Sequence, residues 1–193
     1  MLAMPSPTRF FPALALCIAL DSCENNHLDV YEEPINSMFY VLTPDSGQKV
    51  ILNFIDNDGI GGQPALVNSG ILAPNTTYRG ELLIGTANTV ALAKLEHMAD
   101  STSVTGQPEL HQVFFEPNNG LELVTSCLDI DKNGNPVGMQ TTLTTGSISE
   151  GELVISIIHK PNKQVTAVMN GNRTRAGGSI DVEATFQVTI ASN

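Results

Sequence analysis

The clearest alternation of apolar and polar positions lies at the end of the chain, in the segment DVEATFQVTI (181–190). Apolar side chains stand at every second position from Val182 to Ile190, and polar side chains fill the positions between them. A period of two residues is that of a β-strand with one buried and one wet face. Such a strand is typical of an antiparallel sheet at the surface of a domain.

Similar runs recur along the chain between turn signals. Residues 35–56 contain two apolar runs on either side of Pro44-Asp45-Ser46-Gly47, which predicts a β-hairpin. We expect a strand over residues 78–84 and further strands in ELHQVFFE, LELVTSCLDI, GMQTTLTT, GELVISIIH and QVTAVM. About eight strands spaced by turns predict an all-β domain over residues 35–193, a single antiparallel β-sandwich with immunoglobulin-like or related connections.

At most one short helix is expected, over residues 88–101. Asn88 could cap its N-terminus, and Leu92, Leu95 and Ala99 would lie on one face.

The N-terminus has the features of a lipoprotein signal. The apolar stretch from Phe10 to Leu20 follows Arg9 and is shorter than the roughly 20 residues of a membrane-spanning helix. Leu20-Asp21-Ser22-Cys23 then resembles a bacterial lipobox, in which the cysteine receives diacylglycerol and the chain is cut before it. The alternative is an ordinary secretory signal followed by an incidental cysteine.

We therefore predict a signal peptide over residues 1–22, lipidation of Cys23 and an acidic flexible tether over residues 23–34. The protein would be lipid-anchored in the cell envelope, with the outer membrane as the expected site, on its periplasmic or its surface face. Of the remaining cysteines, Cys17 lies in the removed segment, so Cys127 has no partner for an intramolecular disulfide and is expected in the core.

The charge of the chain excludes some partners. The formal net charge is −11, and it stays −11 when residues 1–22 are removed, because Arg9 and Asp21 leave together. Nucleic acid and anionic lipid head groups are therefore excluded as expected partners. Trp is absent and aromatic residues make up 5% of the chain, which argues against an aromatic sugar-binding platform.

The segment DIDKNGNPVG (129–138) is the most conspicuous candidate site. Asp129, Asp131 and Asn133 alternate before Gly134, as oxygen ligands do in calcium loops, but the twelfth position is Gln140 and not a bidentate glutamate. A weak Ca²⁺ site and a plain hairpin turn at Asn133-Gly134 are both open.

The segment DNDGIGG (56–62) has the same two interpretations with fewer ligands. If the two loops met, Asp56, Asp58, Asp129 and Asp131 could share one ion.

Other chemical signals are weak. The histidines at positions 27, 97, 111 and 159 show no HxH, HExxH or CxxC spacing, and a metal site would need the fold to bring two or three of them together, or one with a carboxylate such as Glu96. A histidine at the end of a strand is expected to be a hydrogen-bonded edge residue. Nucleophile-elbow, P-loop and dinucleotide motifs are lacking, so we expect neither an enzyme nor a cofactor.

Asp100-Ser101-Thr102 resembles the short O-glycosylation signal of Bacteroidota, which makes Ser101 a candidate glycosylation site. A chance match is the alternative.

Several segments together resemble a family of small outer-membrane-type lipoproteins of Bacteroidota. They are LDSC, ILAPNTTYRGELLI, LHQVFFE, DIDKNGNPVGMQTTLTTG, IIHKPNK and AGGSIDVEATFQVTI. The resemblance implies a lipid-anchored envelope protein and supplies no catalytic residues. We expect a non-enzymatic binding or adhesion module with a protein or glycan partner. The alternative is a structural accessory subunit of an envelope complex.

Overall fold

The computed structural model describes residues 35–58, 62–85 and 103–192. Several predictions fall outside the described residues. They are the signal peptide over 1–22, lipidation of Cys23, the tether over 23–34, the helix over 88–101 and glycosylation of Ser101.

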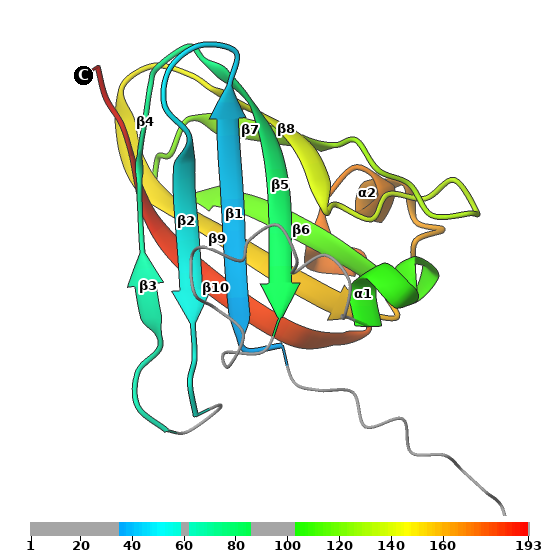
Figure 1. The fold of residues 1–193 in the computed structure, drawn as a ribbon. Helices are drawn as coiled ribbons and strands as arrows, with labels where there is room; N and C mark the ends of the chain where they lie inside the picture. The colour runs from blue at the N-terminus through cyan, green and yellow to red at the C-terminus, as the bar shows by residue number, and fades with distance from the viewer. Residues whose placement is uncertain (1–34, 59–61, 86–102, 193) are drawn as a thin grey trace, which may run out of the picture. The chain divides into compact units, whose positions relative to one another are not determined.

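The described residues form ten strands in two sheets, which confirms the all-β sandwich (Figure 1). The six-stranded sheet has the order β3-β2-β1-β5-β8-β7, and the four-stranded sheet has the order β4-β10-β9-β6. All strand pairs are antiparallel except the short parallel pair of β4 with β10. The strands are β1 (Ser37–Pro44), β2 (Val50–Ile55), β3 (Leu66–Asn68), β4 (Ile71–Leu72), β5 (Thr77–Gly85), β6 (His111–Asn118), β7 (Leu123–Cys127), β8 (Gln140–Thr145), β9 (Ser149–His159) and β10 (Ser179–Ile190).

The predicted hairpin is β1 and β2, paired from Ser37 opposite Ile55 to Leu42 opposite Val50. Its turn ends with Gly47 at a φ of 111°, a conformation that glycine adopts without a steric penalty. Because β1 and β2 pair along their length, the turn lies at one end of the sandwich, and the start of β1 and the end of β2 lie at the other.

The core fills the space between the sheets with side chains from both. Tyr40 and Leu82 from the six-stranded sheet and Ile155 and Phe186 from the four-stranded sheet are among its buried members. Along β10 the buried and exposed residues alternate from Asp181 to Ile190, as the period of two predicts.

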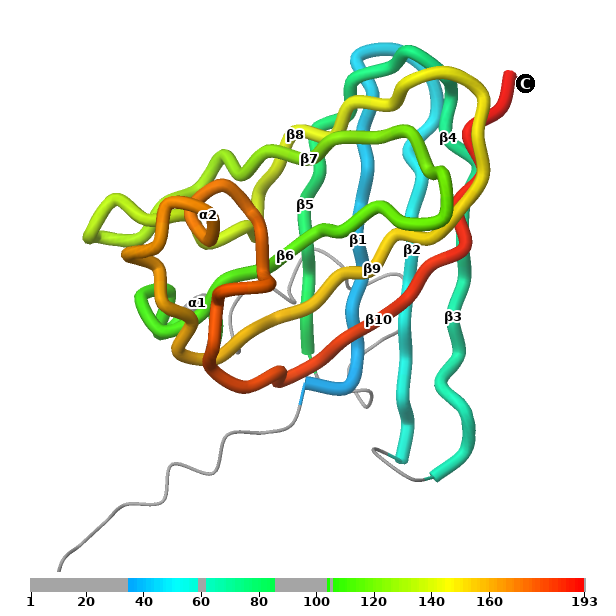
Figure 2. The backbone as a smooth tube through the Cα atoms, turned by 180° about the vertical axis from the view of Figure 1, so that it is seen from behind, coloured from blue at the N-terminus to red at the C-terminus, as the bar shows by residue number. Residues whose placement is uncertain are grey.

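The expected strand in QVTAVM is wrong, because its residues form the single-turn helix α2 (Thr166–Met169). A short apolar run does not fix its own period, and here Val168 packs beside Phe114 and Ile158 instead of joining a sheet. Figure 2 shows β6, β9 and β10 side by side, with α1 (Ser103–Gly106) and α2 at the end where β6 begins.

Two 3₁₀ turns complete the described elements, η3 (Pro108–Leu110) and η4 (Arg173–Arg175). In the part of the chain that the structure describes, no helix has the length and apolar character needed to cross a membrane.

Cys127 ends β7 as a half-buried free thiol. Burial raises the pKa of this thiol to about 11, and the negative charge of Asp129 adds to the effect. At neutral pH the thiol is therefore almost entirely protonated, as expected for a packing residue.

Candidate metal centre at the strand ends

Two histidines meet at one end of the four-stranded sheet. His111 is the first residue of β6, His159 is the last residue of β9, and the antiparallel register places them directly opposite each other. Their imidazole rings meet edge to face, with centroids 4.7 Å apart. The pairing therefore brings together two strand-end residues that are far apart in the sequence.

Asp181 joins them through an irregularity in β10. Ile180 faces Ile158 and Val182 faces Ile157, so Asp181 is the extra residue of a β-bulge. A bulge re-aims a side chain relative to the regular alternation of a strand, and bulges are frequent next to functional sites. The Asp181 Oδ2 atom lies 3.4 Å from His111 Nε2 and 4.0 Å from His159 Nδ1.

These three side chains form a compact group of candidate metal ligands. One nitrogen of each histidine and one oxygen of Asp181 all lie within 4.8 Å of one another. The His111 side chain is fully buried, whereas the His159 and Asp181 side chains are 18% and 23% exposed. The group therefore has one side in the protein interior and one side that solvent can reach.

The hydrogen bond of His111 fixes the role of each ring nitrogen. Its Nδ1 atom lies 3.0 Å from the carbonyl oxygen of Gln107, and because a carbonyl only accepts hydrogen bonds, Nδ1 carries the proton. In the neutral ring, Nε2 then has a lone pair that faces the Asp181 carboxylate oxygen. Nε2 is buried and makes no hydrogen bond to the residues that the structure describes.

A buried nitrogen lone pair that faces a carboxylate oxygen needs a positive charge or a proton between the two atoms. A second proton on His111 would make an imidazolium paired with Asp181, and a metal ion would bind both atoms. Two ligand atoms that are each bonded to a tetrahedral zinc ion at about 2.0–2.2 Å lie about 3.4 Å from each other. The observed 3.4 Å between His111 Nε2 and Asp181 Oδ2 matches this spacing. A metal-bound histidine also commonly donates its other ring N–H to a backbone carbonyl, as His111 does.

The turn that supplies the Gln107 carbonyl is held by buried contacts. Lys163 Nζ donates to the Pro108 carbonyl oxygen at 2.7 Å and to Asp131 Oδ2 at 3.1 Å. On the outside, Lys132 pairs with Glu109 at 3.0 Å. The DIDKNGNPVG loop therefore supports the turn whose Gln107 carbonyl orients the His111 ring.

The predicted calcium ligands Asp129 and Asp131 are engaged by the loop's own backbone. Asp129 accepts hydrogen bonds from the N–H groups of Gly138 and Met139. One oxygen of Asp131 accepts from the N–H groups of Asn133 and Asn135, and the other accepts from Lys163.

These are the hydrogen bonds of a closed turn, with Gly134 at a φ of 80°. A cation would have to compete with them, so the weak Ca²⁺ site stays a prediction and the contacts favour the turn. Burial raises the pKa of the Asp131 carboxyl, but the hydrogen bonds from Asn135, Lys163 and Asn133 outweigh it and hold the pKa below its ordinary value.

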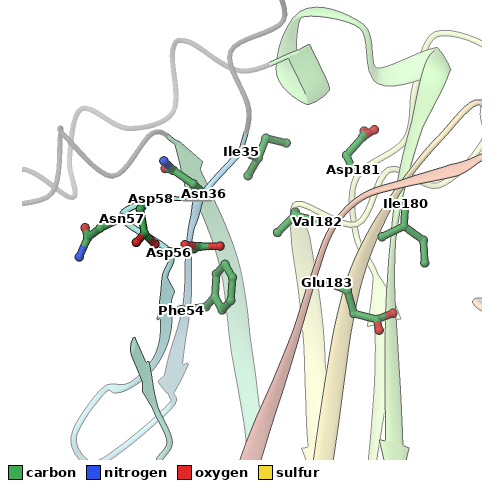
Figure 3. A pocket seen from close by; sticks show the side chains of 10 residues that line it. All are labelled: Ile35, Asn36, Phe54, Asp56, Asn57, Asp58, Ile180, Asp181, Val182 and Glu183. Atoms are coloured by element: carbon green, nitrogen blue, oxygen red, sulfur yellow. The ribbon is translucent and has the colours of Figure 1, made fainter. Parts of the chain in front are cut away.

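Asp56 and Asp58 of the second acidic segment share a cleft with Asp181. A cleft of about 510 Å³ separates the residues that follow β2 from the start of β10 (Figure 3). Asp56 and Asp58 line one side, and Asp181 and Glu183 line the other. Asp181 therefore belongs both to the histidine group and to the wall of the cleft.

Comparison with known proteins returned no matching family model, no matching curated protein and no matching solved structure. The resemblance to lipoproteins of Bacteroidota therefore stays a prediction.

The sequence contained part of the signal for this centre. His111 and His159 each stand at the end of a predicted strand, so an antiparallel pairing of these two strands would have placed them together. Asp181 could not be assigned, because regular alternation along β10 puts it on the wet face and only the bulge turns it toward the histidines.

Proposed function

We propose that this chain is a lipid-anchored binding module of the cell envelope whose ligand is a divalent transition-metal ion. His111, His159 and Asp181 are the protein ligands, and Zn²⁺ is the best match. The observation that supports the proposal most strongly is the buried His111 Nε2 atom. It has no hydrogen-bond partner within residues 35–58, 62–85 and 103–192, and it lies 3.4 Å from the Asp181 carboxylate.

The donor set decides the class of metal. Two imidazole nitrogens and one carboxylate oxygen suit zinc and its first-row neighbours, whereas Ca²⁺ and Mg²⁺ prefer sites made of oxygen. The fit requires only small movements, because the three donor atoms already lie within 4.8 Å of one another. We therefore expect Zn²⁺ to bind and Ca²⁺ not to bind at this centre.

A second candidate function is hydrolysis of a substrate, catalysed by the bound zinc ion. Catalytic zinc sites hold the metal with three protein ligands and leave the fourth position to water. The partial exposure of the His159 and Asp181 side chains, 18% and 23%, would give water access to that position. The test is turnover of ester or amide substrates by the zinc-loaded chain. Turnover that is lost in the Asp181→Asn variant would favour an enzyme over a binding module.

The test of metal binding is calorimetric titration of the full chain with Zn²⁺, with bound metal counted by mass spectrometry. We expect one ion per chain and a loss of affinity of at least about tenfold in Asp181→Asn. Asp45→Asn is the matched control, because Asp45 is an exposed carboxylate in the turn at the other end of β1. Absence of bound Zn²⁺, or equal affinity in both variants, would refute the proposal.

A further inference from the structure

The cleft beside the metal centre has a strong charge bias. Four carboxylate residues line it, and none of the described residues that line it is basic. Among them, Glu183 pairs with Arg173.

Apolar side chains give the cleft a surface on which an uncharged ligand body can rest. Ile35 and Phe54 are half-buried against the core, and Val182 is buried. Figure 3 shows Phe54 beside Asp56 on one side of the cleft and Val182 on the strand that faces them. The cleft therefore offers an apolar surface with carboxylates on both sides, which is complementary to an amphipathic cation.

The metal centre lies at the Asp181 side of this cleft. Three protein ligands leave one position of a four-coordinate zinc ion to a ligand from outside. The fully buried His111 is aimed at Asp181 from the interior, so the outside ligand has to approach from the side on which His159 and Asp181 are exposed.

We propose that the cleft and the metal together bind a positively charged ligand that donates a neutral nitrogen, such as an imidazole or amine, to the open coordination position. This inference rests on the proposed function. Imidazole nitrogen is a good donor for zinc-class metals. Asp56 and Asp58 on the facing side of the cleft attract a cationic group on the ligand and repel a carboxylate or phosphate.

The test uses three probes with the same donor and different charges. The full chain is loaded with Co²⁺, whose visible absorption reports its ligands, and titrated at low ionic strength with N-propylimidazole, N-(aminopropyl)imidazole and imidazolyl-N-propionate. We expect all three to change the Co²⁺ spectrum, with the aminopropyl compound at least about tenfold tighter than the propionate. Added salt should reduce the ratio between the affinities for the aminopropyl compound and the propionate, because salt screens exposed charges.

Two variants assign the selectivity to the cleft. Asp56→Asn should narrow the ratio between the cationic and the anionic probe by about two- to threefold. Asp45→Asn changes the net charge equally at the other end of the sandwich and should leave the ratio unchanged.

Each contrary result has a distinct meaning. A Co²⁺ spectrum that none of the imidazoles changes would overturn this inference and leave the metal centre in place. Equal affinity for the cationic and anionic probes, or tighter binding of the propionate, would overturn the role of the cleft. A chain that takes up no Co²⁺ would overturn the proposed function, and this inference with it.

Discussion

Lys163 and Asp131 form a buried ion pair, with 3.1 Å between Nζ and Oδ2 and side-chain exposures of 4% and 0%. The two residues belong to different loops, and Lys163 also donates to the Pro108 carbonyl oxygen. A buried pair of this kind is seldom a net source of stability, but the loss of one partner leaves an uncompensated charge in the interior. Here the pair also fixes the turn that orients His111.

The first prediction concerns this pair. Lys163→Met should lower the free energy of unfolding by about 3–5 kcal/mol, because Asp131 would stay buried without its cation. The double variant Lys163→Met/Asp131→Asn should recover part of the loss, because it leaves no buried charge. Urea unfolding of the three proteins measures both effects, and a single variant as stable as the wild type would contradict the account.

The second prediction concerns the stability of the fold at low pH. The pKa of Asp131 is lower in the folded chain than the ordinary value of 3.8, so the carboxylate stabilises the fold above that value. This contribution is lost as the pH falls through the lowered pKa, since the folded state then has to take up the proton. Denaturation between pH 6 and pH 2 should show a loss of stability in the wild type, mostly below about pH 4. The double variant should lose less over the same range, and parallel curves would refute the assignment to Asp131.

The third prediction tests the bulge. Deletion of Ile180, whose side chain is 55% exposed, should restore regular pairing in β10 with Val182 still opposite Ile157. Asp181 would then lie opposite Ile158, on the face of the sheet where Ile158 packs against Phe114, and would point away from the histidines. We expect zinc binding to be lost although no ligand residue is removed. Circular dichroism checks that the strands remain, and unchanged zinc affinity would show that the bulge does not place Asp181.

The fourth prediction concerns the N-terminus. Mass spectrometry of the protein extracted from envelopes should show a mature chain that begins at Cys23 with diacylglycerol on the thiol. Replacement of Cys23 by Ser should release the protein from the membrane fraction. An unmodified N-terminus at another residue would contradict the lipoprotein assignment.

The strands could be predicted from sequence because each depends on a local pattern. β10 alternates apolar and polar residues over its length, and the β1–β2 hairpin has strong turn residues between two apolar runs. The sequence around α2 favours a strand, because Val165 and Val168 are β-branched, but in the fold these two residues pack against the cluster that contains Phe114.

The metal centre depends on features that a local pattern does not contain. The meeting of His111 and His159 is set by the pairing register of β6 with β9, and the orientation of Asp181 is set by one extra residue in β10. The spacing of acidic residues in the loop at 129–138 resembles that of a calcium loop, but its carboxylates accept hydrogen bonds from backbone N–H groups and from Lys163. Spacing alone does not distinguish ligands for a cation from acceptors that close a turn.

The most direct test of the metal centre is the proton–nitrogen NMR spectrum of the histidine rings, recorded with and without one equivalent of Zn²⁺. We expect His111 to keep its proton on Nδ1, which donates to the Gln107 carbonyl oxygen, and we expect zinc to shift the resonance of its Nε2 atom. His159 should respond through Nδ1, the nitrogen that lies 4.0 Å from Asp181 Oδ2. A His111 ring that is protonated on both nitrogens and unchanged by zinc would show that an imidazolium–carboxylate pair, and not a metal site, occupies the end of the sheet.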